Sequence, residues 1–219
     1  MSLWIKICGN TSLEDARLAV DAGADAVGFV FAPSPRRVTV EQVSAIVPHL
    51  PAAVEKIGVF VDASLDEIVT AFQACGLTGV QLHFAAAPEL PAQLRARLGP
   101  EARILRVVHF GAEAAEQAAA LAVDPNVDAV LVDSRTALAA GGTGVAFDWE
   151  VARTTLFQNT EARKRLVAAG GLHPANVAEA IVTLRPWGVD AVSGVEAAPG
   201  RKDPVKVRGF VKNARAASS

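Results

Sequence analysis

The sequence predicts an α/β protein in which all 219 residues form a single (β/α)8 barrel, or TIM barrel, as one domain over residues 1–219. Short apolar runs recur at intervals of roughly 20–30 residues, about the size of a βα unit. Such runs are typical of parallel strands that are buried on both faces. The length also fits, because barrels of this kind span about 200–250 residues.

Eight apolar runs predict eight strands, at 4–8, 26–31, 56–61, 79–83, 104–109, 129–133, 165–169 and 190–193. Side chains alternate along a strand, so in the first strand Cys8 and Lys6 are expected to point inward while Ile5 and Ile7 face the helices. The same alternation places Ala129, Leu131 and Asp133 on one face of the sixth strand.

Helix-like stretches separate these strands. The stretch 12–22 ends at Gly23, 65–75 ends at Gly76, and 113–123 is rich in alanine. The stretch 175–184 follows Pro174, and proline suits the first position of a helix. The basic run 201–215 predicts a solvated last helix. Residues 134–147 instead indicate a long loop, and long unstructured connections are usually functional.

The alternative fold is an open, doubly wound sheet. It is disfavoured because no G-x-G-x-x-G turn follows the first strand.

Composition excludes several function classes. The formal net charge is −2, whereas nucleic-acid binding needs a basic face. Two cysteines do not make a disulfide framework in a chain of this size. No apolar stretch approaches the ~18 residues that span a bilayer, and the N-terminus does not resemble a secretory signal. We therefore expect a cytoplasmic protein with neither nucleic acid nor membrane as a partner.

Cys8 and Asp133 are the candidate catalytic residues, since both are expected at the carboxyl-terminal rim where barrel enzymes place their chemistry. A thiol and a carboxyl group on two sides of a pocket can divide the roles of acid and base. The plainer interpretations are a small buried hydrophobe for the cysteine and a turn residue or helix cap for the aspartate. Cys75, inside an apolar helix, is interpreted as core.

Three glycine-containing segments predict a phosphate site. Gly142 and Gly144 lie in the long loop, Gly170 and Gly171 follow the seventh strand, and Ser193 and Gly194 follow the eighth. The loops after strands seven and eight, with a short extra helix, form the usual phosphate site of this barrel. Three flexible turns would be the plainer interpretation.

Four further positions on the strands and loops carry polar groups. Arg36, in the loop after the second strand, can grip a carboxylate with two parallel hydrogen bonds. Lys6 could form a Schiff base, but its place below the rim favours a buried ion pair. Gln81 and His83 are interpreted as pocket or barrel lining. No metal is implied, because no second histidine lies at ligand spacing.

Eight motifs occur in order over nearly the whole chain: KICGN (6–10), GADAVGFVF (23–31), IGVFVD (57–62), VQLH (80–83), LVDS (131–134), GGTGVAFDW (141–149), GGLHPANV (170–177) and SGVEAAPGRKD (193–203). With these motifs the chain resembles the phosphoribosylanthranilate isomerases of tryptophan biosynthesis. The resemblance implies the third step from chorismate. In that step N-(5-phosphoribosyl)anthranilate becomes 1-(2-carboxyphenylamino)-1-deoxyribulose 5-phosphate by an Amadori rearrangement.

The resemblance also assigns roles. Asp133 is implied as the general acid, Cys8 as the general base, and Arg36 as the partner of the anthranilate carboxylate. The glycine segments with Ser193 would hold the phosphate of a small-molecule substrate. No cofactor is implied, and the chain is expected to be a monomer or a homodimer.

The chain departs from the family pattern at Arg37, where tyrosine is usual, at Phe84, where glycine is common, and at Val192, where serine is common. These departures concern affinity more than reaction type. The alternatives are the histidine-pathway aminoaldose isomerase, for which aspartate is expected at position 8, an enzyme acting on both substrates, and a silent barrel that senses a phosphorylated ligand.

Overall fold

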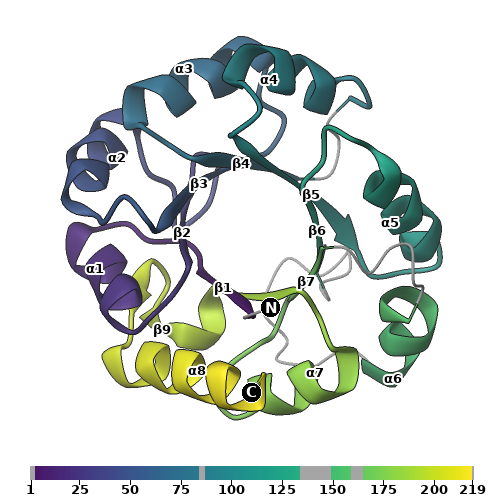
Figure 1. The fold of residues 1–219 in the computed structure, drawn as a ribbon. Coiled ribbons are helices and arrows are strands. Elements are labelled where there is room, and N and C mark those ends of the chain that lie inside the picture. Colours follow the sequence, from purple (N-terminus) through teal and green to yellow (C-terminus); the bar gives the residue numbers. More distant parts are fainter. Residues whose placement is uncertain (1–2, 84–86, 134–148, 159–164, 219) are drawn as a thin grey trace.

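Eight parallel strands close into a barrel in a computed structural model of the chain, which describes residues 3–83, 87–133, 149–158 and 165–218. Each strand pairs with its neighbour in sequence, and the first pairs with the eighth. The strands are β1 (Trp4–Ile7), β2 (Ala26–Val30), β3 (Glu55–Phe60), β4 (Gly79–Leu82), β5 (Arg103–His109), β6 (Ala129–Asp133), β7 (Leu166–Ala169) and β8 (Gly188–Ala191). The predicted fold is therefore confirmed (Figure 1).

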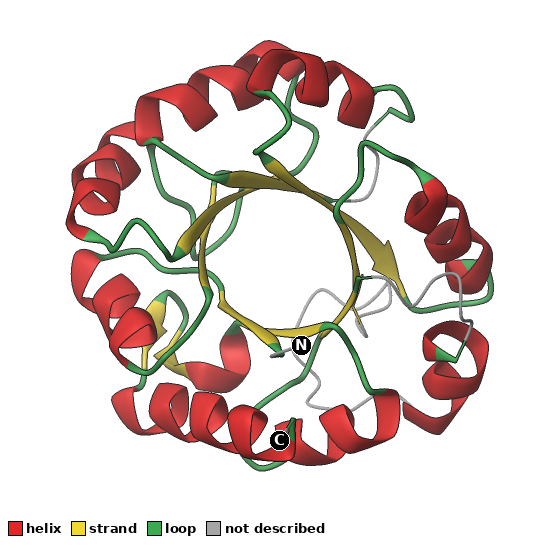
Figure 2. Ribbon diagram, viewed as in Figure 1, coloured by secondary structure: helices red, strands yellow, loops and turns green. Residues whose placement is uncertain are grey.

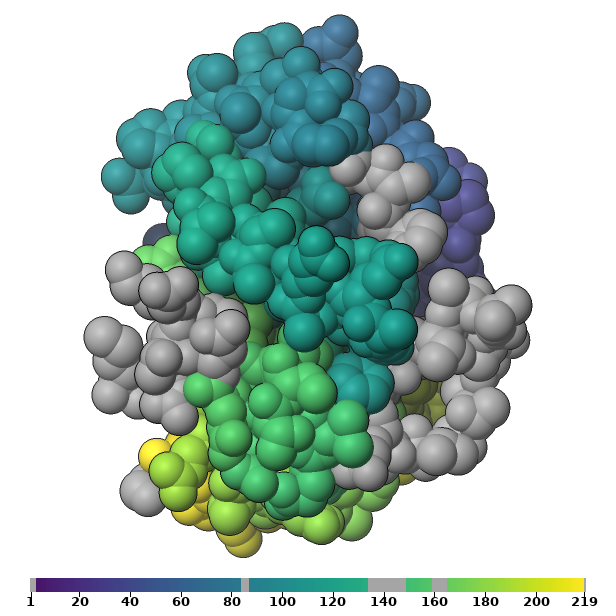
Figure 3. Space-filling view, turned by 90° about the vertical axis from the view of Figure 1, so that its right-hand side faces the viewer, coloured from purple at the N-terminus to yellow at the C-terminus, as the bar shows by residue number. Residues whose placement is uncertain are grey.

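A ring of helices surrounds the strands (Figure 2). These are α1 (Leu13–Asp21), α2 (Val40–Ile46), α3 (Leu65–Cys75), α4 (Leu90–Leu98), α5 (Ala114–Val123), α6 (Trp149–Ala152), α7 (Val177–Leu184) and α8 (Pro204–Ala217). Short turns extend two of them, η1 (Val47–His49) after α2 and the π-helical η2 (Arg153–Phe157) after α6. Figure 3 shows the outer surface of the molecule from the side of α5 and α6. Among the described residues, no helix is both long and apolar enough to cross a membrane.

Side-chain caps define several helix starts. Ser12 accepts from the Asp15 N–H at the start of α1, and Asp203 accepts from the N–H groups of Val205 and Lys206 at the start of α8. Thr39 begins α2 with a reciprocal capping box. Such caps satisfy backbone donors that have no partner within the helix.

The core has two parts, as the predicted alternation requires. Ile5 and Ile7 belong to the larger cluster, which includes buried residues of the helices. The smaller cluster lies on the inner face of the strands and includes Ala129 and Leu131. At its amino-terminal end, the rings of Trp4 and Trp187 stack with centroids 5.2 Å apart. The inward direction of the Asp133 side chain follows from its alternation with Leu131.

Three predictions about the late part of the chain were wrong. The eighth strand ends at Ala191, so Ser193 lies beyond it in a short helical turn, η4 (Ser193–Val195). Helix α7 begins at Val177 rather than near Pro174, because the Asn176 side chain and backbone close a turn on His173. Lys202 is 3% exposed and precedes α8, so it is not part of a solvated helix.

The outer core supplies a test of the fold. Phe29 of β2 is fully buried in the larger cluster. We expect Phe29→Ala to lower the free energy of unfolding in urea by about 3–5 kcal/mol, through lost burial and the cavity left behind. The control is Val205→Ala in α8, where the side chain is 79% exposed, and its effect should stay within about 0.5 kcal/mol. Equal effects of the two changes would contradict this core assignment.

Candidate active site

Cys8 and Asp133 belong to segments far apart in the chain but lie at the same end of the barrel. Cys8 follows β1 directly, and its N–H donates to Ala191 O over 2.9 Å. Asp133 is the last residue of β6, and its register partner on β5 is His109. Each is 3% exposed. Both predicted catalytic residues thus lie at the carboxyl-terminal rim.

A glycine leaves room for the inward-facing Cys8 thiol. A Cβ atom at Gly28 of β2 would lie 2.5 Å from Cys8 Sγ, closer than real atoms approach. Only glycine leaves room for the sulfur there. Gly28 belongs to the motif GADAVGFVF, but nothing in the sequence indicated that it faces Cys8.

A buried ion pair lies below Cys8. Lys6 is fully buried, and its Nζ is 3.0 Å from Asp190 Oδ1. Burial by itself would lower the pKa of Lys6, but the charges of Asp190 and Cys8 outweigh it, and this pKa is raised above its ordinary value. The contact with Asp190 confirms the ion-pair prediction for Lys6. An ammonium group that holds its proton cannot attack a carbonyl, so a Schiff base at Lys6 is disfavoured.

The environment of the Cys8 thiol contains opposing influences. Burial raises its pKa above the ordinary value, and the negative charge of Asp190 adds to this. Lys6 lowers it, through its charge and a hydrogen bond, and Lys202 lowers it through its charge. Burial prevails, so the pKa of Cys8 is raised overall. Lys6 is the main group that favours the thiolate, which is the reactive form of cysteine.

Two histidines and a glutamine line the neighbouring part of the rim. Gln81 Nε2 lies 3.4 Å from His83 Nε2, which confirms that the two side chains share a face. The rings of His83 and His109 are 6.0 Å apart. No group of three metal-binding side chains occurs in the part of the chain that the structure describes.

Arg36 lies closer to Cys8 than the sequence alone could establish. Its Cδ is 2.8 Å from where a Cβ of Gly9 would be, and Gly9 directly follows Cys8. Nε and Nη2 of Arg36 donate to the two carboxylate oxygens of Glu196, over 2.8 and 2.7 Å. Arg37 is exposed, so of the two adjacent arginines only Arg36 is in a position to serve the site.

The loops after β7 and β8 approach each other closely. A Cβ at Gly194 would lie 2.0 Å from Leu172 O, so only glycine allows this contact. Gly170 and Gly171 have φ values of 83° and 64°, which also favour glycine. Ser193 and Gly194 open η4, where the first N–H groups have no partner within the helix. A short extra helix at this place is usual in the phosphate sites of such barrels.

Gly142 and Gly144 lie outside the described residues, as does Phe84. Their predicted contributions stay predictions.

Three residues of the site were missed: Asp190, Glu196 and Lys202. Glu196 and Lys202 stand within the motif SGVEAAPGRKD, where Glu196 is a charged residue among apolar and small residues, whereas Lys202 lies between Arg201 and Asp203. For Glu196 that context signals burial, whereas the charged neighbours of Lys202 suggest exposure although its side chain is buried.

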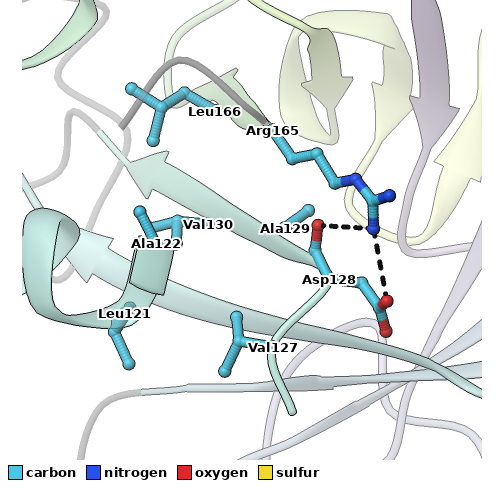
Figure 4. A pocket seen from close by; sticks show the side chains of 8 residues that line it. All are labelled: Leu121, Ala122, Val127, Asp128, Ala129, Val130, Arg165 and Leu166. Carbon is cyan, nitrogen blue, oxygen red and sulfur yellow. Dashed lines mark hydrogen bonds and ion pairs between the residues drawn. The ribbon is translucent and has the colours of Figure 1, made fainter. Parts of the chain in front are cut away.

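The apolar pocket drawn in Figure 4 does not belong to this site. It holds about 150 Å³ and is lined by α5 and by the amino-terminal ends of β6 and β7. At its edge Arg165 pairs with Asp128. It therefore lies at the end of the barrel opposite Cys8 and Asp133, the end usually concerned with stability rather than catalysis.

Comparisons with known proteins agree on one family. The sequence profile of N-(5′-phosphoribosyl)anthranilate isomerase matches residues 5–213. The N-(5′-phosphoribosyl)anthranilate isomerase of Pelobacter propionicus is 44% identical over 212 residues, which cover 96% of this chain and 95% of the relative. The crystal structure of phosphoribosylanthranilate isomerase from Thermotoga maritima has a TM-score of 0.84 at 37% identity, covering 98% of this chain and 99% of that one.

A second solved structure carries a ligand. It is a phosphoribosylanthranilate isomerase in complex with reduced 1-(o-carboxyphenylamino)-1-deoxyribulose 5-phosphate. Its TM-score is 0.81 at 35% identity, and the match covers 98% of this chain and 99% of that one.

The ionisation of Cys8 can be tested by alkylation. In a Cys75→Ala background Cys8 is the only thiol. We expect its reaction with iodoacetamide to reach half its maximal rate at a higher pH than a free cysteine does, because burial raises the pKa of Cys8. Adding Lys6→Met removes the main opposing charge, so the midpoint should move to still higher pH and the rate at pH 7 should fall several-fold.

The control is Lys212→Met, which removes an exposed positive charge from α8. It should leave the midpoint unchanged. A midpoint that Lys6→Met does not move would show that Lys6 is structural only.

Proposed function

This chain belongs to the N-(5′-phosphoribosyl)anthranilate isomerase family, and we propose that it converts N-(5-phosphoribosyl)anthranilate to 1-(2-carboxyphenylamino)-1-deoxyribulose 5-phosphate. The family consists of isomerases of tryptophan biosynthesis. The observation that carries the proposal is the pair of Cys8 and Asp133 at one end of the barrel, in a chain that matches the family over nearly its whole length.

The reaction is an Amadori rearrangement, an internal transfer of oxidation state. Asp133 acts first, as the general acid: it protonates the furanose ring oxygen, the bond from C1 to that oxygen breaks, and an iminium ion forms between C1 and the anthranilate nitrogen. Cys8 then removes the proton from C2 as the general base, and the electron pair moves to give an enolamine. Tautomerisation oxidises C2 to a ketone and reduces C1 to an amine, so no external electrons are needed.

The charges around Cys8 suit this role. Cysteine can accept a proton only as the thiolate, and the charge of the buried Lys6 ammonium favours that form. Asp190 keeps Lys6 charged, at a distance of 3.0 Å. The pair therefore supports base catalysis by Cys8 without taking part in a proton transfer itself.

Both ends of the substrate would be anchored. Arg36 would bind the anthranilate carboxylate, and the backbone of Gly170, Gly171, Ser193 and Gly194 would bind the phosphate, with Gly142 and Gly144 as further predicted contributors. Backbone N–H groups that converge on one point can hold an anion. Fixing both ends places C2 over the thiol, and such positioning supplies a large part of catalysis.

The proposal is tested by direct assay. Substrate generated in situ is fluorescent, and its loss reports turnover. We expect the wild-type chain to be active without added metal or nicotinamide. Cys8→Ser and Asp133→Asn should each lower kcat on the order of 10²–10⁴-fold, the usual contribution of a general acid or base.

Cys75→Ala is the matched control, since it removes the other cysteine, and should keep wild-type turnover. Growth of a tryptophan auxotroph that lacks this step is an independent readout. Absence of turnover by wild-type chain at micromolar concentration would contradict the proposal and favour a barrel that only binds a phosphorylated ligand.

The phosphate loops are tested by Gly194→Ala. The added methyl group would push η4 away from Leu172 O, since the two atoms would be 2.0 Å apart. We expect KM for substrate to rise about 10-fold or more, because hydrogen bonds to a charged group contribute about 1.5–3 kcal/mol. The inhibition constant of inorganic phosphate should rise in parallel. Gly99→Ala, whose added methyl would contact nothing within 4 Å, is the control, although its φ of 89° also strains it. If Gly194→Ala raised KM no more than Gly99→Ala, the phosphate assignment would be wrong.

A further inference from the structure

Two buried charges occupy a small hairpin after η4. The hairpin consists of β9 (Glu196–Ala198) and β10 (Arg201–Lys202), which pair antiparallel. Glu196 is 6% exposed and Lys202 3%. Lys202 Nζ lies 3.2 Å from Glu196 Oε1. Charged side chains are almost never buried to this degree unless they are paired.

Glu196 holds Arg36 by one edge. The Nε and Nη2 atoms of Arg36 face the two oxygens of Glu196, which is the bidentate geometry of a strong arginine–carboxylate pair. A guanidinium group has a second edge, formed by Nη1 and Nη2. Within the described residues, Nη1 of Arg36 has no acceptor, so this second edge remains available to a carboxylate.

Lys202 connects the same cluster to Cys8. Its Nζ donates to Cys8 O over 2.6 Å and to Val192 O over 3.4 Å. One ammonium group therefore contacts the backbone of the catalytic cysteine, the loop after β8 and the carboxylate that holds Arg36.

The hairpin itself is anchored to α1 and α8. The Lys202 N–H donates to Asp15 Oδ1 over 3.2 Å, and Thr11 Oγ1 donates to Gly200 O over 2.6 Å. Lys206 Nζ of α8 donates to Glu196 O over 2.8 Å. These bonds limit how far Glu196 and Lys202 can move relative to the barrel.

The ionisation of Glu196 and Arg36 is consistent with a persistent contact between these two side chains. Burial by itself would raise the pKa of Glu196, but the hydrogen bond from Arg36 and the charge of Lys202 outweigh it, so this pKa is lowered. The hydrogen bond to Glu196 raises the pKa of Arg36. Both groups are therefore charged around neutral pH.

We propose that Glu196 and Lys202 are positioning residues that hold Arg36 at a set distance from Cys8 and direct its second guanidinium edge to the carboxylate of the substrate. This inference rests on the proposed function, in which Arg36 binds the anthranilate carboxylate. In the opposite role, Glu196 would compete with the substrate carboxylate for Arg36 and would have to be displaced when the ligand binds.

A binding experiment separates these roles. The first probe is reduced 1-(o-carboxyphenylamino)-1-deoxyribulose 5-phosphate, and the second is the same compound without the carboxyl group. We expect Glu196→Gln to weaken binding of the carboxylated compound by about tenfold or more, as measured by calorimetry, because a neutral amide holds the guanidinium less firmly. Binding of the compound without the carboxyl group should change less than about twofold.

A double-mutant cycle tests whether Glu196 acts through Arg36. In an Arg36→Ala background, Glu196→Gln should cause no further loss of affinity for the carboxylated compound. In the steady state, Glu196→Gln should raise KM more than it lowers kcat. Asp66→Asn is the control, since Asp66 forms an exposed ion pair with Arg97 and should leave both affinities unchanged.

If Glu196→Gln does not fold, Glu196→Asp keeps the negative charge but is too short for the bidentate contact, and the same selective loss is expected. Tighter binding of the carboxylated compound would overturn the proposal in favour of competition. An equal loss for both compounds would overturn it in favour of a general structural role. A wild-type chain that binds neither compound would contradict the proposed function itself, whereas wild-type binding with an unaffected Glu196→Gln variant would contradict this inference alone.

Discussion

The ion pair between Lys6 and Asp190 lies where the barrel closes and constrains the register of β1 against β8. Lys6 of β1 pairs in register with Asp190 of β8, and both side chains are buried. A slip of one residue would turn Lys6 into the apolar layer under the helices, where its charge would have no partner. Since Cys8 follows Lys6 by two residues, the same register turns the thiol toward the interior. The position of Cys8, the proposed catalytic base, is therefore a consequence of barrel closure.

Close backbone approach shapes the rest of the rim. Gly28 leaves room for the sulfur of Cys8, and Gly194 lets the loop after β8 contact Leu172 O. In both places a methyl group would occupy space that another atom already fills. The site therefore depends on missing side chains as well as on the charged groups.

The sequence predicted the strands and their inner faces well, because an alternation of two residues is a local property. Leu131 lies in the inner cluster and Ile7 in the outer one, as expected. It failed where local signals were weak. The apolar residues around Val192 did not mark the end of β8, and the basic composition near Lys202 suggested solvent exposure although that side chain is buried. Gly142 and Gly144 stay predictions.

The sequence by itself determined the barrel, the inward direction of Cys8 and, through its ordered motifs, the family. Only the tertiary structure decided which charges meet. Lys6 pairs with Asp190 across 184 positions and Arg36 with Glu196 across 160, and Lys202 donates to the backbone carbonyl of Cys8 across 194. A periodic pattern states which face a side chain occupies, but a partner so distant in the chain is selected by the closure of the barrel and the placement of the hairpin after it. Burial then makes each pairing obligatory, because a charge removed from water needs a counter-charge nearby.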